Sequence, residues 1–316
     1  MKSIIKIFSL SLLFTVAISI MSSNKSVAQT VTLQVFYDQL SPYGTWVHHN
    51  TYGYVFVPKV EAGFTPYNTG GHWVLTDDGW TWVSDYKWGW AAFHYGRWHA
   101  DAVHGWLWIP DTHWGPAWVA WRRSDSYYGW APLEPGIRIR TGFRTPVIPE
   151  DRWVFVKHSD FIRPDVNHYY VNRTENVTII KNTTVINNTY IDKGRKTTYV
   201  TGPSRDDVQK TTGKEVTKVS IKESTKPGQD LKNNELEIYK PKVEKSTANT
   251  KKPAPAKVGN IEDEKHPLNL QEQTTTNKKG SKKTDSKKST TKNKDNKKKQ
   301  QPQSETADQQ KPPQNK

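Results

Sequence analysis

Short runs of alternating apolar and polar residues recur between residues 44 and 132, separated by glycines and polar turn residues. Successive side chains of a strand point to opposite faces of a sheet, so each pair of runs predicts one β-hairpin. Proline lacks the backbone donor of a sheet ladder, so Pro58, Pro110 and Pro132 are expected to end the returning strands. The predicted strand pairs lie at 44–47 and 53–58, 72–74 and 79–83, 96–98 and 105–110, and 118–121 and 129–132.

The tryptophans follow the same repeats. Thirteen of the fourteen lie between Trp46 and Trp130, and only Trp153 falls outside. An isolated hairpin is marginally stable, but neighbouring units can share one core, as in other repeat architectures. Trp80 and Trp82 occupy alternate positions of one predicted strand and are expected to face that core together. We therefore expect residues 29–135 to form a Trp-rich β-repeat domain.

The pattern changes on both sides of the repeats. Residues 29–37 alternate and predict a leading strand. Ser204 and the acidic residues behind it predict a short helix that ends near Gly213. The fold class expected is mainly β: Trp-rich β-hairpin repeats, a small α+β segment over 136–222 and a disordered basic tail. The strands predicted in the α+β segment are 152–157, 177–180, 183–186, 197–200 and 215–221.

The N-terminus has the features of a secretory signal peptide. Lys2 and Lys6 precede an apolar stretch over 7–20, and small residues end at Ala28, where cleavage is predicted. The apolar stretch is shorter than the roughly 20 residues that span a bilayer, and no later segment is long enough, which argues against a retained anchor. There is no cysteine, so an exported domain would be held by packing without disulfides. We expect the chain to be exported to the periplasm, the cell envelope or the outside of the cell.

Residues 223–316 are rich in Lys, Gln, Asn and Pro, and we expect them to be disordered because they offer little apolar surface to bury. Counted from Lys222, this region has 23 Lys and no Arg against 13 acidic residues, so it carries +10 of the whole-chain charge of +15. Such a tail attracts anionic polymers without specificity and in a salt-sensitive way. Without Arg it offers no bidentate reading of bases, so no specific nucleic-acid partner is expected. The alternative is a solvated tether that binds nothing.

Six blocks of the repeat region resemble the signature of a family of exported bacterial Tyr/Trp/Gly-repeat envelope proteins, the domain of unknown function 6600. The resemblance covers roughly residues 36–135 and implies an exported aromatic repeat domain with no established activity. The blocks, in order, are Ser41 to Val47, Tyr52 to Pro58, Gly79 to Ser84, Trp88 to Ala91, His94 to Trp98 and Gly129 to Leu133.

Catalysis finds little support in the sequence. A carboxylate pair on an aromatic groove would suit a glycan hydrolase, but Asp77 and Asp78 sit beside Gly79 in a predicted turn, where Asp is common for local reasons. No Cys nucleophile and no Gly-x-Ser-x-Gly elbow is present. We therefore predict a protein that is not an enzyme, without catalytic residues or cofactors. The other carboxylates considered are Asp85, Asp101 and Asp111.

Four histidines and Asp101 fall within twenty residues and could gather around a metal. Their spacing matches no metal motif, and alternation along strands is expected to send them to different faces. The sequence thus favours surface or packing roles and predicts no metal site, with His94, His99 and His104 as the weak candidates and His113 beyond them.

Binding and structural roles remain as alternatives for the tryptophans. Exposed Trp stacks on sugar rings, whereas buried Trp builds a core. We expect a scaffold in which most tryptophans pack, while Trp88, Trp90 and Trp114, in less regular connections, are ligand-stacking candidates. The function predicted is a non-catalytic cell-envelope protein, either a scaffold or a binding module with a polybasic tether. A glycan- or peptidoglycan-binding module and, behind it, an envelope glycan hydrolase are the alternatives.

Overall fold

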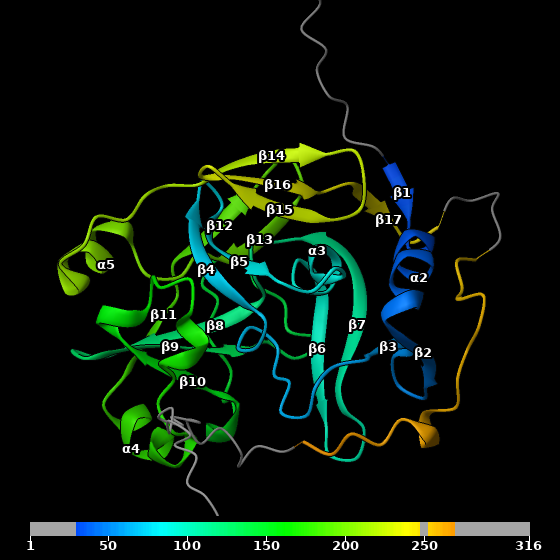
Figure 1. Ribbon diagram of the computed structural model, residues 1–316, viewed down its shortest axis with the longest axis horizontal. Helices are drawn as coiled ribbons and strands as arrows, with labels where there is room; N and C mark the ends of the chain where they lie inside the picture. The colour runs from blue at the N-terminus through cyan, green and yellow to red at the C-terminus, as the bar shows by residue number, and fades with distance from the viewer. Residues whose placement is uncertain (1–29, 247–251, 269–316) are drawn as a thin grey trace, which may run out of the picture. The chain divides into compact units, whose positions relative to one another are not determined.

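Four antiparallel hairpins form where the repeats predict them in the computed structural model of the chain (Figure 1). The structure describes residues 30–246 and 252–268, all of which belong to one unit that spans residues 1–275. The hairpin prediction is confirmed. The paired strands are β2 (Gly44–His49) with β3 (Gly53–Pro58), β4 (Gly71–Thr76) with β5 (Gly79–Ser84), β6 (Tyr95–Asp101) with β7 (Gly105–Trp114), and β8 (Val119–Arg123) with β9 (Tyr127–Pro132).

The prolines end only two of the returning strands. Pro58 and Pro132 are the last residues of β3 and β9, as predicted. Pro110 instead lies inside β7, where the register against β6 shifts between Tyr95 and Arg97. A proline is tolerated at such an irregularity because no ladder donor is required there.

Aromatic contacts join the hairpins into one core. The first and third hairpins share the sheet β2-β3-β7-β6, with Trp46 and Trp108 at a ring-centroid distance of 6.2 Å. The second and fourth meet through Trp73, whose ring lies 4.6 Å from Trp121 and 5.5 Å from Trp130. Each such pair adds about 0.5–1.5 kcal/mol beyond the burial of its area. The repeats therefore stabilise one another rather than folding separately.

Two segments predicted as strands contain helices. β1 covers only Thr30–Thr32, and α2 (Gln34–Leu40) replaces the rest of the predicted leading strand. In α2 the buried side chains of Phe36, Tyr37 and Leu40 follow helical spacing and face the core. The predicted strand at 177–180 is α4 (Asn176–Lys181), so β-branched propensity was overridden by tertiary packing.

The boundary predicted at residue 135 does not separate two domains. β10 (Val154–Lys157) and β11 (Thr184–Ile186) flank β9 and β8 in the sheet β10-β9-β8-β11, which spans both predicted parts. β12 (Thr189–Asp192) and β13 (Thr197–Val200) form a further hairpin. The predicted helix is confirmed as α5 (Arg205–Thr212), because Ser204 Oγ accepts from Asp207 N at its start and Gly213 ends it at φ 66°.

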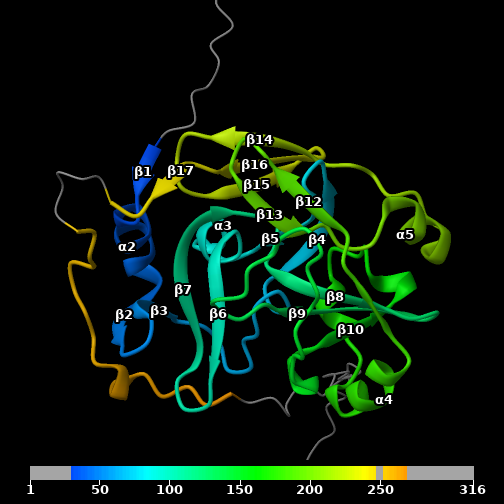
Figure 2. The same cartoon turned by 180° about the vertical axis from the view of Figure 1, so that it is seen from behind.

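Order continues past residue 223, where disorder was predicted. β14 (Ser220–Ser224), β16 (Glu235–Tyr239) and β15 (Gln229–Lys232) form a sheet, and β17 (Lys242–Glu244) pairs in parallel with β1. The predicted strand at 215–221 is thus displaced into β14. Figures 1 and 2 show this sheet beside the second hairpin, where Val219 N donates to Leu75 O. The prediction of disorder is wrong over 223–246 because alternate residues of β16, such as Leu236 and Ile238, are fully buried in the aromatic core.

Residues 252–268, here called the C-terminal strap, run along the edge of the unit beside α2 and β2 (Figures 1 and 2). Gly259 N donates to Trp46 O at 2.8 Å, and Ile261 packs on the outer face of the first sheet. The rest of the predicted tail (247–251 and 269–316) and the predicted signal peptide lie outside the described residues. Among the helices that the structure describes, each is too short or too polar to cross a bilayer.

Candidate functional site

Every tryptophan is buried, with at most 6% of its surface exposed. The predicted ligand-stacking residues Trp88, Trp90 and Trp114 are each 2% exposed. A ring that stacks on a sugar must present a free face. The expectation that these three side chains remain available to a ligand is therefore wrong.

Aromatic partners from other segments cover two of the three rings. Trp88 stacks on nearby Phe93 at a centroid distance of 5.5 Å and meets Phe56 of β3 edge-on at 6.3 Å. Trp90 meets Phe36 of α2 at 5.8 Å and Tyr239 of β16 at 5.1 Å. The region around Trp90 looks irregular in sequence because its packing partners lie more than fifty residues away.

Trp114 is covered by polar side chains. The His94 ring stacks parallel to it at 5.4 Å, and the Lys240 ammonium lies 3.5 Å from its centroid. His94 is fully buried, with Nδ1 3.0 Å from Gly115 O, so Nδ1 carries the ring proton and donates it. Burial lowers the pKa of His94 to about 4, with Gly115 O opposing and Lys240 reinforcing the shift.

Three of the aspartates weighed as catalytic groups, Asp77, Asp78 and Asp111, each have a separate partner. Asp78 pairs with Lys240, and Asp77 forms an ion pair with Lys218. Asp111 Oδ1 accepts from Thr112 N at 2.6 Å and lies 3.4 Å from His113 Nδ1. Burial raises the pKa of Asp111, but its hydrogen bonds and the charges of His113 and Arg97 outweigh this and lower it to about 2.

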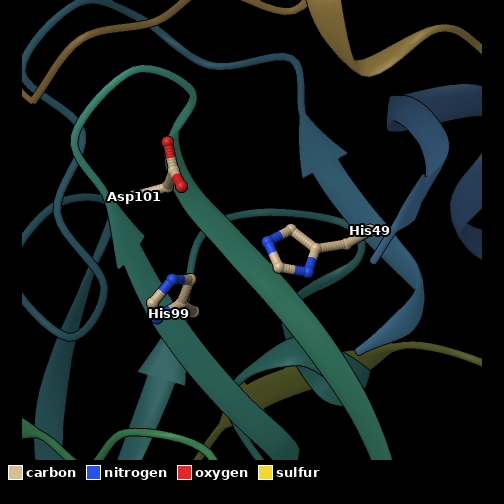
Figure 3. A group of neighbouring side chains, drawn as sticks. All are labelled: His49, His99 and Asp101. Atoms are coloured by element: carbon tan, nitrogen blue, oxygen red, sulfur yellow. The ribbon is translucent and has the colours of Figure 1, made fainter. Parts of the chain in front are cut away.

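The weak metal candidates His94, His99 and His104 do not form one cluster. His99 does, however, lie close to Asp101, which was considered with them. His94 and His113 make the separate contacts described above. His99 and Asp101 lie two residues apart on β6 and so share a face. His49, at the end of β2, joins them, and the candidate ligand atoms of the three side chains lie within 4.8 Å of one another (Figure 3).

Hydrogen bonds fix the two β6 side chains of this cluster. Glu134, just beyond β9, accepts through Oε2 from His99 Nδ1 at 2.8 Å and through Oε1 from Ala100 N at 3.3 Å. Asp101 Oδ1 accepts from the backbone N and from Nδ1 of His104, at 2.8 and 2.9 Å. These bonds use His99 Nδ1 and Asp101 Oδ1. His99 Nε2 and Asp101 Oδ2 are therefore the remaining candidate ligand atoms.

His49 is held more loosely. Tyr52, in the turn after β2, stacks on the His49 ring at 4.9 Å and meets His99 edge-on at 5.1 Å. Thr51 N donates to His49 Nδ1 at 3.1 Å, and Figure 3 shows the other ring nitrogen of His49 turned toward the rest of the cluster. All three members of the cluster are partly exposed.

The cluster contains groups of contrasting proton affinity. Partial burial and the neighbouring His99 lower the pKa of His49. The hydrogen bond to Glu134 raises the pKa of His99. Partial burial raises the pKa of Asp101, but the hydrogen bonds from His104 and Val103 outweigh this and lower it. At neutral pH the cluster therefore combines a carboxylate with an imidazole, His49, that stays unprotonated.

A cavity of about 360 Å³ lies next to the cluster. His104, the partner of Asp101, lines it together with Trp106, Phe64 and Glu61, and Leu268 of the C-terminal strap closes another side. An added Cβ at Gly105 would lie 2.3 Å from His266 O, so the strap approaches β7 closely at this point.

Sequence reasoning missed His49 and Glu134. The usable signal was the period-two spacing of His99 and Asp101 on one predicted strand, which puts both on one face. Nothing in the local sequence connects them to His49, fifty residues earlier, or to Glu134 after the fourth hairpin. Their proximity depends on the strand order β2-β3-β7-β6, which the repeat pattern does not specify.

The fold and its core define an aromatic β-hairpin repeat protein. Residues 37–137 match the model of a family of unknown function, DUF6600, and this confirms the predicted resemblance of the repeat region to the domain of unknown function 6600. The match covers the four hairpins and includes His49, His99, Asp101 and Glu134. Neither the curated proteins nor the solved structures contain a match to this chain.

Proposed function

We propose that this chain is a non-catalytic, exported protein of the cell envelope, in which the DUF6600 region serves as a structural scaffold. The observation that carries the proposal is the burial of all fourteen tryptophans. Side chains that would otherwise mark a glycan-binding platform supply the core instead. Binding to the envelope is therefore assigned to another part of the chain.

The Lys-rich C-terminal region is the part proposed to bind the cell envelope. Beyond the strap, residues 269–316 contain runs such as Lys297 to Lys299 and no Arg. Point charges on flexible stems attract phosphate and carboxylate groups without reading their arrangement. The partner proposed is an anionic envelope polymer, bound weakly and in a salt-dependent manner.

A non-catalytic role agrees with the separate partners of the aspartates. A retaining or inverting glycan hydrolase needs two carboxyl groups across one sugar site. Asp78 is instead committed to Lys240, and Asp101 to the turn at His104. Each of the two carboxylates therefore has a structural role in this fold.

Co-sedimentation with insoluble peptidoglycan carrying anionic polymer tests the proposal. The chain from residue 29 should sediment with it at low salt, be released at high salt, and lose binding when it is shortened to end at residue 268. Retention of the shortened chain on uncharged glycan at high salt would point to a glycan-binding module. Release of new reducing ends from the polymer would point to a hydrolase.

A further inference from the structure

The donor atoms of His49, His99 and Asp101 suit a divalent transition metal. Zn²⁺ is bound by imidazole nitrogen and carboxylate oxygen, and open sites use three protein ligands with water in the fourth position. Ligand distances of about 2.0–2.1 Å place tetrahedral donors about 3.4 Å apart. The candidate ligand atoms of the three side chains are up to 4.8 Å apart. Rotation of these partly exposed side chains brings the atoms to the required spacing.

The support of His99 has the form common behind metal-binding histidines. A ligating imidazole usually donates its second N–H to a carboxylate, which fixes the ring and the tautomer. Glu134 Oε2 occupies this position 2.8 Å from His99 Nδ1, so Nε2 is left to coordinate. Glu134 is itself held to β6 by the hydrogen bond from Ala100 N.

Asp101 is also prearranged. Its Oδ1 is fixed by His104 and by Val103 N at 2.9 Å, which leaves Oδ2 as the ligand atom. The carboxylates of Asp101 and Glu134 offset the one guanidinium, Arg152, whose charge acts on His99. The local charge is therefore compatible with a bound cation.

His49 completes the set at a small cost. Coordination through Nε2 requires the ring proton on Nδ1, so the Thr51 N–H gives up its bond to His49. That N–H lies at an exposed turn, where water replaces the lost acceptor. The stacked ring of Tyr52 keeps the imidazole beside the cluster.

We propose that His49, His99 and Asp101 bind one Zn²⁺ ion, with Glu134 positioning His99 and water completing the coordination. The site joins the end of β2 to the β6–β7 hairpin and lies next to the cavity that includes His104. This inference is independent of the scaffold role proposed above.

Isothermal titration with ZnCl₂ on the metal-stripped chain from residue 29 tests the site. One equivalent should bind with micromolar affinity. His49→Asn, His99→Asn and Asp101→Asn should each weaken binding at least tenfold, and Glu134→Gln by about tenfold or more, as expected for a ligand's carboxylate partner. His48→Asn is the matched control: His48 is the exposed neighbour on the opposite face of β2, and its loss should leave the affinity unchanged.

A second measurement does not depend on how the variants fold. In the unaltered protein, Zn²⁺ should shift the imidazole NMR signals of His49 and His99 and leave those of His48 and His113 in place. The proposal is overturned if Zn²⁺ does not saturate a site at micromolar concentration. It is also overturned if His48→Asn weakens binding as much as His49→Asn, or if the signals of other histidines move instead.

Discussion

Lys240 Nζ lies 2.8 Å from Asp78 Oδ2, and the Lys240 side chain is only 4% exposed. The pair joins the end of β16 to the turn of the second hairpin, across 162 residues of sequence. Tyr199 adds a hydrogen bond from its hydroxyl to Asp78 Oδ1 at 3.1 Å. Burial lowers the pKa of Lys240, while Asp78 acts in the opposite direction. The ion pair therefore fixes the late sheet to the Trp-rich core.

Lys240→Met should destabilise the fold by about 3 kcal/mol. Removing one partner of a buried pair leaves the other charge uncompensated, and Trp114 loses the cation above its ring. Urea unfolding followed by tryptophan fluorescence measures the change. Lys242→Met, which removes an exposed pair with Glu244, is the control and should change stability by less than about 0.5 kcal/mol.

The double variant Asp78→Asn with Lys240→Met separates the pair from simple loss of packing. Without the carboxylate, no buried charge remains to be paired, so the double variant should be more stable than the sum of the single changes predicts. Additive effects would show that the two charges do not interact.

Trp90→Ala should lower the free energy of unfolding by about 3–5 kcal/mol, because it opens a cavity between α2 and β16. Thermal and urea denaturation measure the loss. Tyr190→Ala is the control, because Tyr190 is 49% exposed, and should cost less than about 1 kcal/mol. A Trp90→Ala protein of unchanged stability that had lost binding to a glycan would restore the ligand-stacking interpretation.

The four hairpins were predictable because each is local. Gly79 and its polar neighbours define a turn, and Trp80 and Trp82 alternate over a short span, so no knowledge of distant segments was required. The cap of α5 is equally local, since Ser204 and Asp207 lie three residues apart. Both features are encoded within about ten residues, which is the range over which turn and cap chemistry acts.

Features that depend on distant partners were missed. Trp90 could be placed in the core only by knowing that Phe36 forms part of a helix and that Tyr239 is ordered. The composition of the region from residue 223 onward is dominated by its last fifty residues, which hid the alternation in β16. The candidate site was missed for the same reason. The proximity of His49 and His99 follows from the strand order of the sheet, which the sequence pattern does not give.

The C-terminal strap should stabilise the fold. A chain that ends at residue 251 should be less stable than one that ends at 268 by on the order of 2 kcal/mol, because it uncovers the apolar face formed by Val47, Val57 and Leu107. Ending the chain at 268 instead of 316 keeps every contact of the strap and should leave stability unchanged. Thermal melts of the three chains measure this.

A point substitution checks the same idea without truncation. Ile261→Ala removes the strap side chain that packs on that face and should cost about 1 kcal/mol, whereas Val258→Ala, at a position 41% exposed, should cost almost nothing. Equal effects of the two substitutions would mean that the strap does not hold the sheet.

His94 should make the fold acid-sensitive between about pH 6.5 and pH 4. Its pKa is about 4 in the folded protein, against an ordinary value of 6.5 for a solvated histidine, so the unfolded chain binds the proton more tightly. The stability that neutral His94 contributes is complete above pH 6.5 and falls by about 3 kcal/mol as the pH drops to 4.

His94→Asn isolates this contribution. The amide can still donate to Gly115 O in place of Nδ1 but does not titrate, so the variant should be less stable than the wild type at pH 7 and lose less stability on acidification. His72 and His158, whose pKa values are also lowered by burial, titrate in both proteins and cancel in the difference. Urea unfolding at pH 7 and pH 4 gives the two free energies. If the difference in unfolding free energy between wild type and variant is the same at pH 7 and pH 4, His94 is either protonated in the core or exposed to solvent.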